Sequence, residues 1–233
     1  MTSPHWPLTG LRLRTPRLEL RWPTLSDLDD LATLAQDGVH DPGMQPFAVA
    51  WTDAPAAELA SRSLRYYWAQ WGAWRLNDWT LHLVAVHDGT VVGTQAMRGQ
   101  DFAILREVST GSWLGRKHHR QGMGTEMRAA ILSLAFDGLH AQYAVSTAHC
   151  DNVASLGVSR RLGYAKDGIE RLVVRKRPAT AQRLRLDRAS WQAHSSLRVE
   201  TSGLEPCLPW FGLAPEGSAS GSALTRADRR GPP

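Results

Sequence analysis

Two glycines, Gly122 and Gly124, stand two positions apart in the segment HHRQGMGTEMRAAIL. Glycine lacks a Cβ, so the backbone at these positions can approach a ligand closely. The residues that follow are typical of a helix, and the free N–H groups and the dipole at a helix N-terminus favour an anion. The spacing therefore predicts a phosphate-binding loop, to which Thr125 could add a hydroxyl group and Lys117 or Arg120 a positive charge.

Two known phosphate loops do not fit the segment. A Walker loop places a lysine directly after its second glycine, and neither Gly122 nor Gly124 is followed by one. The dinucleotide fingerprint requires a third glycine at position 127, where Met127 stands. A glycine-rich helix start that binds no ligand remains the alternative, because a single G-x-G pair is a weak signal.

The elements that would position this loop follow from hydrophobic periodicity and turn residues. Leucines alternate along residues 10–23, which predicts a half-buried strand interrupted near Pro16. Asp88 and Gly89 lie between two β-rich runs, which predicts a tight hairpin over residues 80–97. Further strands are expected at 107–115, 142–147 and 182–187, helices at 26–36 (capped by Ser26), 54–71, 125–139 and 151–164, and a loop at 37–53. This order implies a mixed sheet with helices on both faces, hence an α/β domain.

The composition distinguishes between globular, membrane and secreted classes of protein. With 42% hydrophobic residues the chain can bury a normal core, and no apolar run approaches the roughly 18 residues of a membrane span. The N-terminus has no apolar core of a signal peptide, and Cys150 and Cys207 form no metal or disulfide pattern. We therefore expect a cytoplasmic protein with free thiols. Residues 1–211 should form one domain and residues 212–233, which lack aromatic side chains, a disordered tail.

The net charge of +5 is concentrated in one segment. Between Arg171 and Arg198 there are eight arginines and lysines and a single acid, Asp187. A basic face on one segment suits an anionic ligand or an acidic partner, and is weaker evidence for a nucleic-acid groove. Nucleic acid is therefore not expected as a partner, and a solvated face that binds no ligand is the alternative.

Gly122 and Gly124 are followed by the pair Asn152 and Ser155 and by the segment 162–164, and these spaced motifs together resemble the GNAT superfamily of acyl-CoA N-acyltransferases. The family's phosphate loop reads [RQ]-x-x-G-x-[GA], and a later helix carries N-x-x-[AS] and ends in L-G-[FY]. Gly122 and Gly124, Asn152 and Ser155, and the segment 162–164 match these positions in order. The resemblance extends over about residues 16–186 and is strongest from 113 to 164. The segments HWPL, GVHDP, GSWLG, GTEMRAA and VSRRLGY are similar to actinobacterial members, one of them a mycobacterial succinyltransferase.

Two positions depart from the family pattern. His119 occupies the [RQ] position, although Arg120 and Gln121 adjoin it. The tyrosine that many relatives carry seven residues after the asparagine is Ser159 here, so the residue that usually protonates the departing thiolate is missing.

The resemblance implies a twisted, mostly antiparallel sheet whose central strands, 108–114 and 142–147, run parallel but splay around the pantetheine arm of an acyl-CoA. The backbone of Leu114 would pair with this arm like an added strand. Asn152, Ser155 and Ser159 would share the cofactor-facing side of the last helix. The implied cofactor-binding residues are Leu114, Lys117, His119, Arg120, Gln121, Gly122, Met123, Gly124, Thr125, Asn152, Ser155 and Ser159.

The implied chemistry is direct attack by an amine on the thioester carbonyl, within a ternary complex. An amine with a pKa near 10.4 is about one part in a thousand neutral at pH 7.4, which costs about 4 kcal/mol. Positioning two substrates contributes roughly 7–11 kcal/mol, so no covalent enzyme intermediate is required. Ser155 is the candidate acid for the thiolate. Glu107 is the candidate base, acting through water, with a plain salt bridge as its alternative role.

The remaining predictions concern substrates and partners. His40, Phe47 and Trp51 lie where relatives shape the acceptor and acyl pocket. The acceptor could be a small-molecule amine or a protein amine, and the donor acetyl-CoA or succinyl-CoA. No metal site is expected, since the adjacent histidines 118 and 119 point apart in an extended loop. A homo-oligomer is left open, since the sequence does not determine the oligomeric state, and a catalytically idle acyl-CoA sensor is the alternative function.

Overall fold

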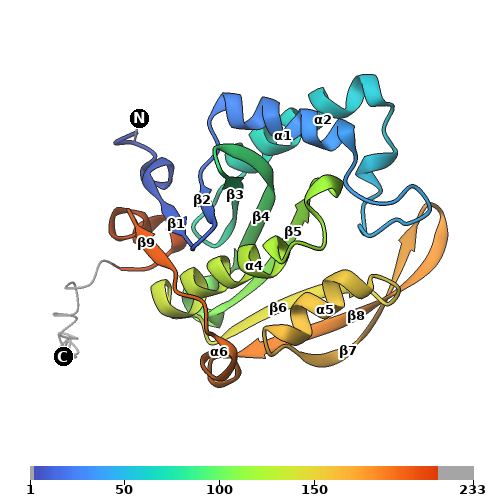
Figure 1. Cartoon of the computed structure of the whole chain (residues 1–233). Coiled ribbons are helices and arrows are strands. Elements are labelled where there is room, and N and C mark those ends of the chain that lie inside the picture. Colours follow the sequence, from blue (N-terminus) through green and yellow to red (C-terminus); the bar gives the residue numbers. More distant parts are fainter. Residues whose placement is uncertain (1–2, 215–233) are drawn as a thin grey trace, which may run out of the picture.

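The fold is built on one open sheet whose strands are joined mostly in antiparallel fashion. The computed structural model describes residues 3–214, so the expected tail falls outside the described part from residue 215 onward. Within that part nine strands hydrogen-bond in the order β7-β8-β6-β5-β4-β3-β2-β1-β9 (Figure 1). Their bounds are β1 Arg12–Arg14, β2 Leu18–Arg21, β3 Asp78–His87, β4 Thr90–Gln100, β5 Glu107–Leu114, β6 Tyr143–His149, β7 Ala165–Val174, β8 Arg177–Asp187 and β9 Glu200–Ser202.

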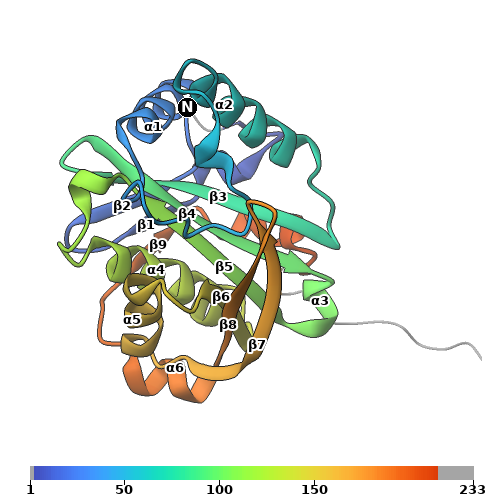
Figure 2. The ribbon, with the colours of Figure 1, turned by 90° about the vertical axis from the view of Figure 1, so that its right-hand side faces the viewer.

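Helices cover both faces of this sheet, as the sequence predicts. Helices α1 and α2 lie on one side, and α4 and α5 on the other (Figure 2). The helices are α1 Leu25–Asp37, α2 Ala56–Gly72, α3 Phe102–Leu105, α4 Met123–Ser133, α5 Val153–Arg161 and α6 Arg188–His194. Short turns of 3-10 helix occupy Trp51–Asp53 and Arg116–His118, and a π-helical turn, Leu134–Gly138, continues α4.

The two-residue period of β3 explains how one strand serves two cores. Leu81 and Leu83 are fully buried in the larger core cluster, which also contains Met127 of α4. Val84 points to the opposite face, where it joins a cluster with Leu28 of α1. The sheet is therefore buried on both sides, which is the condition for the α/β class.

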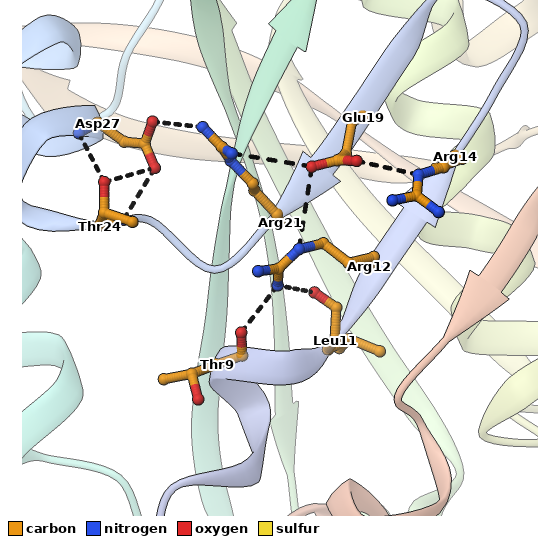
Figure 3. Close-up of polar contacts among 8 residues, drawn as sticks. All are labelled: Thr9, Leu11, Arg12, Arg14, Glu19, Arg21, Thr24 and Asp27. Carbon is orange, nitrogen blue, oxygen red and sulfur yellow. Dashed lines mark hydrogen bonds and ion pairs between the residues drawn. The ribbon is translucent and has the colours of Figure 1, made fainter. Parts of the chain in front are cut away.

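The first strand of the chain is interrupted where the sequence predicts. Strands β1 and β2 pair antiparallel with Leu13 opposite Leu20, and the turn between them contains Pro16. Three arginines, 12, 14 and 21, each approach the carboxylate of Glu19 within 4 Å (Figure 3).

The expected cap of the first helix is wrong by two residues. Thr24 is the N-cap, and its hydroxyl accepts a hydrogen bond from the amide of Asp27, whose carboxylate in turn accepts from the Thr24 amide (Figure 3). Ser26 lies inside the first turn of α1. Asp27 also accepts from Arg21 at 2.6 Å, so the capping box is joined to β2 and fixes the start of the helix.

The central hairpin is confirmed. Asp88 and Gly89 both have positive φ angles, 47° and 75°, as a two-residue primed turn requires. Other boundaries shift: the helix predicted at 125–139 begins at Met123, and its last turn is π-helical. The helix predicted at 54–71 buries Tyr67, but Tyr66 and Trp68 of the same helix are about half exposed, so only part of its aromatic face reaches the core.

Four strands and α-helices are absent from the expectations drawn from the sequence: β7, β9, α3 and α6. Strand β7 forms a sheet edge beside β8, β9 pairs with β1 at the opposite edge, and α6 follows β8 directly. Helix α6 packs through Trp191, whose ring stacks on Phe136 at 5.8 Å. Within residues 3–214 no helix combines the length and the apolar character of a membrane span.

Candidate functional site

A gap opens between β5 and β6, the one parallel pair among the strands of residues 3–214. The register contains three residue pairs: Glu107 opposite Tyr143, Val108 opposite Ala144, and Ser109 opposite Val145. Beyond these the strands part, although β5 continues to Leu114 and β6 to His149. The predicted splay of the central strands is confirmed, and it leaves the far end of β5 without a strand partner on this side.

The loop that follows β5 leads directly to the start of α4. Arg120 and Gly122 have positive φ angles of 60° and 80°, which turn the chain sharply before the helix. Gly122 is the N-cap, and no side chain in the described part caps the helix. The first amides of α4, those of Met123 and Gly124, therefore have no helical acceptor, and they suit the phosphate oxygens of a nucleotide.

An ion pair fixes the orientation of this helix start. Glu126 of α4 is buried, and its carboxylate accepts hydrogen bonds from the Thr15 hydroxyl at 2.6 Å and from Arg17 Nε at 2.7 Å. Arg17 also donates to the carbonyl of Gln121 at 2.9 Å. Burial alone would raise the pKa of Glu126, but these hydrogen bonds outweigh it and the pKa is lowered. The loop is thereby held to the turn between β1 and β2.

Other predicted loop residues take part in local contacts. The His119 ring lies 3.1 Å from the carbonyl of Leu114, so it holds the end of β5. Lys117 reaches Asp37 at the end of α1, with 3.6 Å between Nζ and the carboxylate. The Thr125 hydroxyl lies 3.3 Å from a guanidinium nitrogen of Arg161, which brings a further positive charge to the start of α4.

The three polar residues of α5 differ in their surroundings. Asn152 is the N-cap, and its side-chain oxygen accepts from the amide of Ser155 at 3.1 Å. Ser155 is half-buried. Ser159 is fully buried, and its hydroxyl has no hydrogen-bond partner within residues 3–214. Asn152 caps α5, so the hydroxyls of Ser155 and Ser159 do not take part in the helix cap.

Arg128 crosses the gap between the parting strands. It is buried on α4, and its guanidinium lies 3.3 Å from the hydroxyl of Ser112 on β5 and 3.3 Å from that of Ser146 on β6. Sequence reasoning missed this position of Arg128, because arginine at a helix position usually indicates a solvated face.

Glu107 lies at the closed end of the gap. It pairs in the sheet with Tyr143 and forms an ion pair with Arg185 of β8. It does not line the cavity described below. This position favours the alternative given for Glu107 above, a structural salt bridge.

A cavity of about 600 Å³ opens on the α1–α2 side of the sheet. Phe47 and Trp51 line it, and their rings are 5.3 Å apart, with Trp51 5.6 Å from Trp113 of β5. His40 lies behind this wall, with its ring 5.9 Å from Phe47 and Nε2 2.8 Å from the Thr52 hydroxyl. The structure therefore groups all three predicted pocket residues, with His40 in support.

His82 is a cavity residue that the sequence did not reveal. It lies on β3, is 4% exposed, and lines the cavity with Tyr66 and Tyr67. Burial lowers the pKa of His82 to about 4, so the imidazole is neutral at physiological pH. Burial also raises the pKa of both tyrosines, which keeps the surroundings of His82 uncharged.

The described part of the chain holds no group of three or more histidine, cysteine or acidic side chains that could bind a metal ion. The site brings together free amides, hydroxyls, a buried imidazole and a buried guanidinium. Such groups can bind phosphate and transfer protons.

Similar solved structures share this architecture. RimJ of Mycobacterium smegmatis, solved with a CoA disulfide, is 19% identical with a TM-score of 0.64, over 78% of this chain and 88% of that one. RimL, a ribosomal L7/L12 α-N-protein acetyltransferase solved with coenzyme A, is 16% identical with a TM-score of 0.58, over 74% and 95%. The microcin C7 self-immunity acetyltransferase MccE, solved with acetyl-CoA and AMP, is 14% identical with a TM-score of 0.57, over 74% and 93%.

A family model described as an acetyltransferase (GNAT) domain matches residues 17–165. The matched region runs from the β1–β2 turn to the start of β7, and so contains the loop, the gap and the cavity. The chain therefore belongs to the GNAT acetyltransferase family.

Proposed function

We propose that this protein is an acyl-CoA-dependent N-acyltransferase that moves an acetyl or succinyl group to a primary amine. The observation that carries the proposal is the parting of β5 and β6 after three residue pairs, with the uncapped start of α4 at the end of β5. A gap of this kind accepts an extended chain, and the free amides of a helix start bind its diphosphate.

The cofactor would be held along the loop and α5. The amides of Met123 and Gly124 bind the diphosphate, with Thr125 and the side chains of Lys117, Arg120 and Gln121 around it. Hydrogen bonds to charged groups contribute roughly 1.5–3 kcal/mol each, so a few anchor the nucleotide end. The thioester end then lies in the gap beside Leu114 and the polar residues Asn152, Ser155 and Ser159 of α5.

The reaction is direct attack of the amine nitrogen on the thioester carbon. The N–C bond forms, the C–S bond breaks, and the thiolate takes a proton, for which Ser155 is the candidate donor. Arg128 adds positive charge to the gap in which negative charge develops on sulphur. Glu107 stays a candidate base acting through water, although its ion pair with Arg185 supports a structural role.

The acceptor would enter from the α1–α2 side. The cavity that contains Phe47 and Trp51 reaches Gly111 and Ser112 on the free part of β5, so an amine placed there meets a thioester in the gap. A small-molecule amine and a protein amine both fit an open cavity of this size. RimL, an α-N-protein acetyltransferase of the same fold, favours including a protein N-terminus in any test.

Short sequence motifs support a closer relationship to actinobacterial members, including the mycobacterial succinyltransferase, and hence the inclusion of succinyl-CoA as a donor. A cytoplasmic location fits the use of acyl-CoA. Assembly into homo-oligomers is a further expectation, which size-exclusion chromatography with light scattering would test.

The test is release of free thiol from acetyl-CoA and from succinyl-CoA with a panel of acceptors. The panel contains 2-phenylethylamine, the amide of Nα-acetyl-lysine and a peptide with a free N-terminus. Acceptor-dependent thiol release with either donor supports the proposal. Calorimetry first checks that the protein binds acyl-CoA. If protein that binds acyl-CoA releases no thiol with any pair of donor and acceptor, the proposal is contradicted.

The alternative is an acyl-CoA sensor without turnover, and the observation that favours it is serine at position 159 in place of the family's tyrosine. Ser155→Ala separates the two functions. An enzyme loses turnover on this change while its affinity for acyl-CoA is retained. For a sensor, the wild-type protein already shows no turnover, so Ser155→Ala can change only the affinity for acyl-CoA.

A further inference from the structure

The imidazole of His82 is buried without a hydrogen-bond partner. Its side chain is 4% exposed, and neither Nδ1 nor Nε2 has a partner among residues 3–214. Buried polar groups in folded proteins are nearly always paired, and an unpaired one destabilises the fold. A histidine kept at this cost, on the wall of a cavity, is expected to serve a ligand.

The strand register connects His82 to the gap. His82 lies opposite Ala96 on β4, and Ala96 lies opposite Gly111 on β5, so the three form one row across the sheet. All three line the same cavity, and a Cβ built on Gly111 meets no atom within 4 Å. Because the two residues beside His82 are small, the floor of the cavity is open from the imidazole to the free part of β5.

The dimensions of this row suit a bound amine. Neighbouring strands lie about 4.8 Å apart, so the backbone of His82 is about 10 Å from that of Gly111 across the sheet. His82 lines the cavity, but both of its ring nitrogens are shielded in this conformation, so a rotation about the Cβ–Cγ bond is needed to turn one of them towards the cavity. A primary amine lying over Ala96 then faces that nitrogen on one side and a thioester beside β5 on the other.

The surroundings keep the imidazole neutral. The rings of Tyr66 and Tyr67 meet it edge to face, with centroids 5.5 Å and 5.3 Å away. The charged residue of the cavity lining is Arg62, which forms an ion pair with Glu58 on the exposed side of α2. A neutral imidazole has one nitrogen with a free lone pair, and this nitrogen can accept an N–H proton.

We propose that His82 is a catalytic residue that accepts the proton lost by the attacking amine. The proposal rests on the N-acyltransferase function proposed above. As the N–C bond forms, the nitrogen becomes positively charged and its N–H far more acidic than that of a free amine, so a weakly basic imidazole suffices. The proton passes to the free ring nitrogen and then to water, the C–S bond breaks, and the thiolate is protonated separately.

The experiment compares His82→Ala and His82→Gln with the wild-type protein and with His194→Gln, a histidine of α6 outside the cavity. Rates are measured with the panel amine that the wild type acylates fastest. Both His82 variants are expected to lose at least about 100-fold in kcat, the lower range for general base catalysis, with unchanged affinity for acyl-CoA. His194→Gln is expected to retain wild-type kcat.

Chemical rescue separates catalysis from packing. Free imidazole should restore turnover to His82→Ala in a saturable manner, because the vacated space opens on the cavity, and it should not restore His82→Gln. Wild-type kcat in either folded His82 variant overturns the proposal, as does a loss in His82→Ala that imidazole does not restore. Thermal melting checks the fold, and the Gln variant preserves side-chain volume where Ala does not. An inactive wild type would instead contradict the N-acyltransferase function itself.

Discussion

Arg175 and Asp53 form a two-bond ion pair between segments far apart in the sequence. The guanidinium donates to the carboxylate at 2.7 Å from Nε and 2.6 Å from Nη2. The hydrogen bonds from Arg175 are the main reason that the pKa of Asp53 is lowered. This pair joins the turn of the β7–β8 hairpin to the Trp51–Asp53 turn, and Trp51 lines the cavity on the α1–α2 side of the sheet (Figure 1).

Breaking this ion pair should change substrate binding more than stability. Both side chains are exposed, so Arg175→Ala and Asp53→Ala should leave the melting temperature nearly unchanged. We expect each variant to raise KM for the acceptor several-fold, because the Trp51–Asp53 turn, which carries a residue of the cavity wall, loses its contact with the β7–β8 hairpin. The double variant should be no worse than either single one. Effects on KM that add in the double variant would show that the two side chains act separately.

Gly122→Ala should weaken acyl-CoA binding. The φ angle of 80° costs a residue with a Cβ about 1–2 kcal/mol, and the new Cβ would lie 3.3 Å from Arg17. Calorimetry should show a higher Kd for acyl-CoA. The matched control is Gly157→Ala in α5, where a Cβ meets no atom within 4 Å and where alanine should stabilise the helix. Equal affinities in the two variants would contradict the phosphate-loop assignment.

Glu126→Gln should destabilise the protein by about 1–3 kcal/mol at neutral pH, since a buried, hydrogen-bonded carboxylate loses its charge. The pKa of Glu126 is lowered in the fold. Its stabilising effect is therefore complete above the unfolded value of 4.5 and is lost as the pH falls through the folded pKa. Urea unfolding should show a difference between wild type and variant that shrinks below pH 4.5. A difference independent of pH would exclude an ionic contribution.

His82 should make the wild-type fold sensitive to mild acid. The unfolded imidazole binds a proton near pH 6.5, whereas the folded one does so near 4, so stability falls as the pH decreases between these values. The loss should approach roughly 3 kcal/mol, at about 1.4 kcal/mol per unit of pKa difference. Urea unfolding of His82→Gln over the same range should show a smaller decrease. Parallel curves for the two proteins would mean that the imidazole is not desolvated.

Gly111→Val tests the open floor of the cavity. Valine suits a strand, and its side chain would enter free space on the cavity side. We expect kcat/KM for the acceptor to fall while the affinity for acyl-CoA and the melting temperature stay near those of the wild type. A variant with unchanged acceptor kinetics would place the amine elsewhere.

Local sequence signals predicted the parts of the fold that depend on local interactions. The turn at Asp88 and Gly89 requires positive φ angles, and the alternating leucines of β1 and β2 are buried on one side, so both could be read from a few residues. Strand β7 escaped detection because it is a sheet edge. Its side chains, including Ile169 and Val173, are mostly exposed, so hydrophobicity does not alternate along it.

Within the candidate site, the sequence located the helix start and the helix cap that short motifs mark. Gly122 and Asn152 are recognisable because a helix start and a helix cap impose their own residue types. His82 carries no such mark: in the run TLHLVAV it resembles any strand histidine. The role proposed for His82 depends on Ala96 and Gly111, which only the register of three strands brings beside it.

Because β5 and β6 pair over only three residues, the sheet consists of two parts, β7-β8-β6 and β5-β4-β3-β2-β1-β9, that are joined by few hydrogen bonds. A ligand that fills the gap would supply hydrogen-bond partners for the unpaired backbone of β5 and connect the two parts of the sheet. Binding then adds RT ln(1 + [L]/Kd) to the free energy of unfolding, so a ligand present at 100 times its Kd contributes about 2.7 kcal/mol. The concentration of acyl donor would in this way determine the conformational stability and hence the lifetime of the folded protein, as well as its rate of turnover.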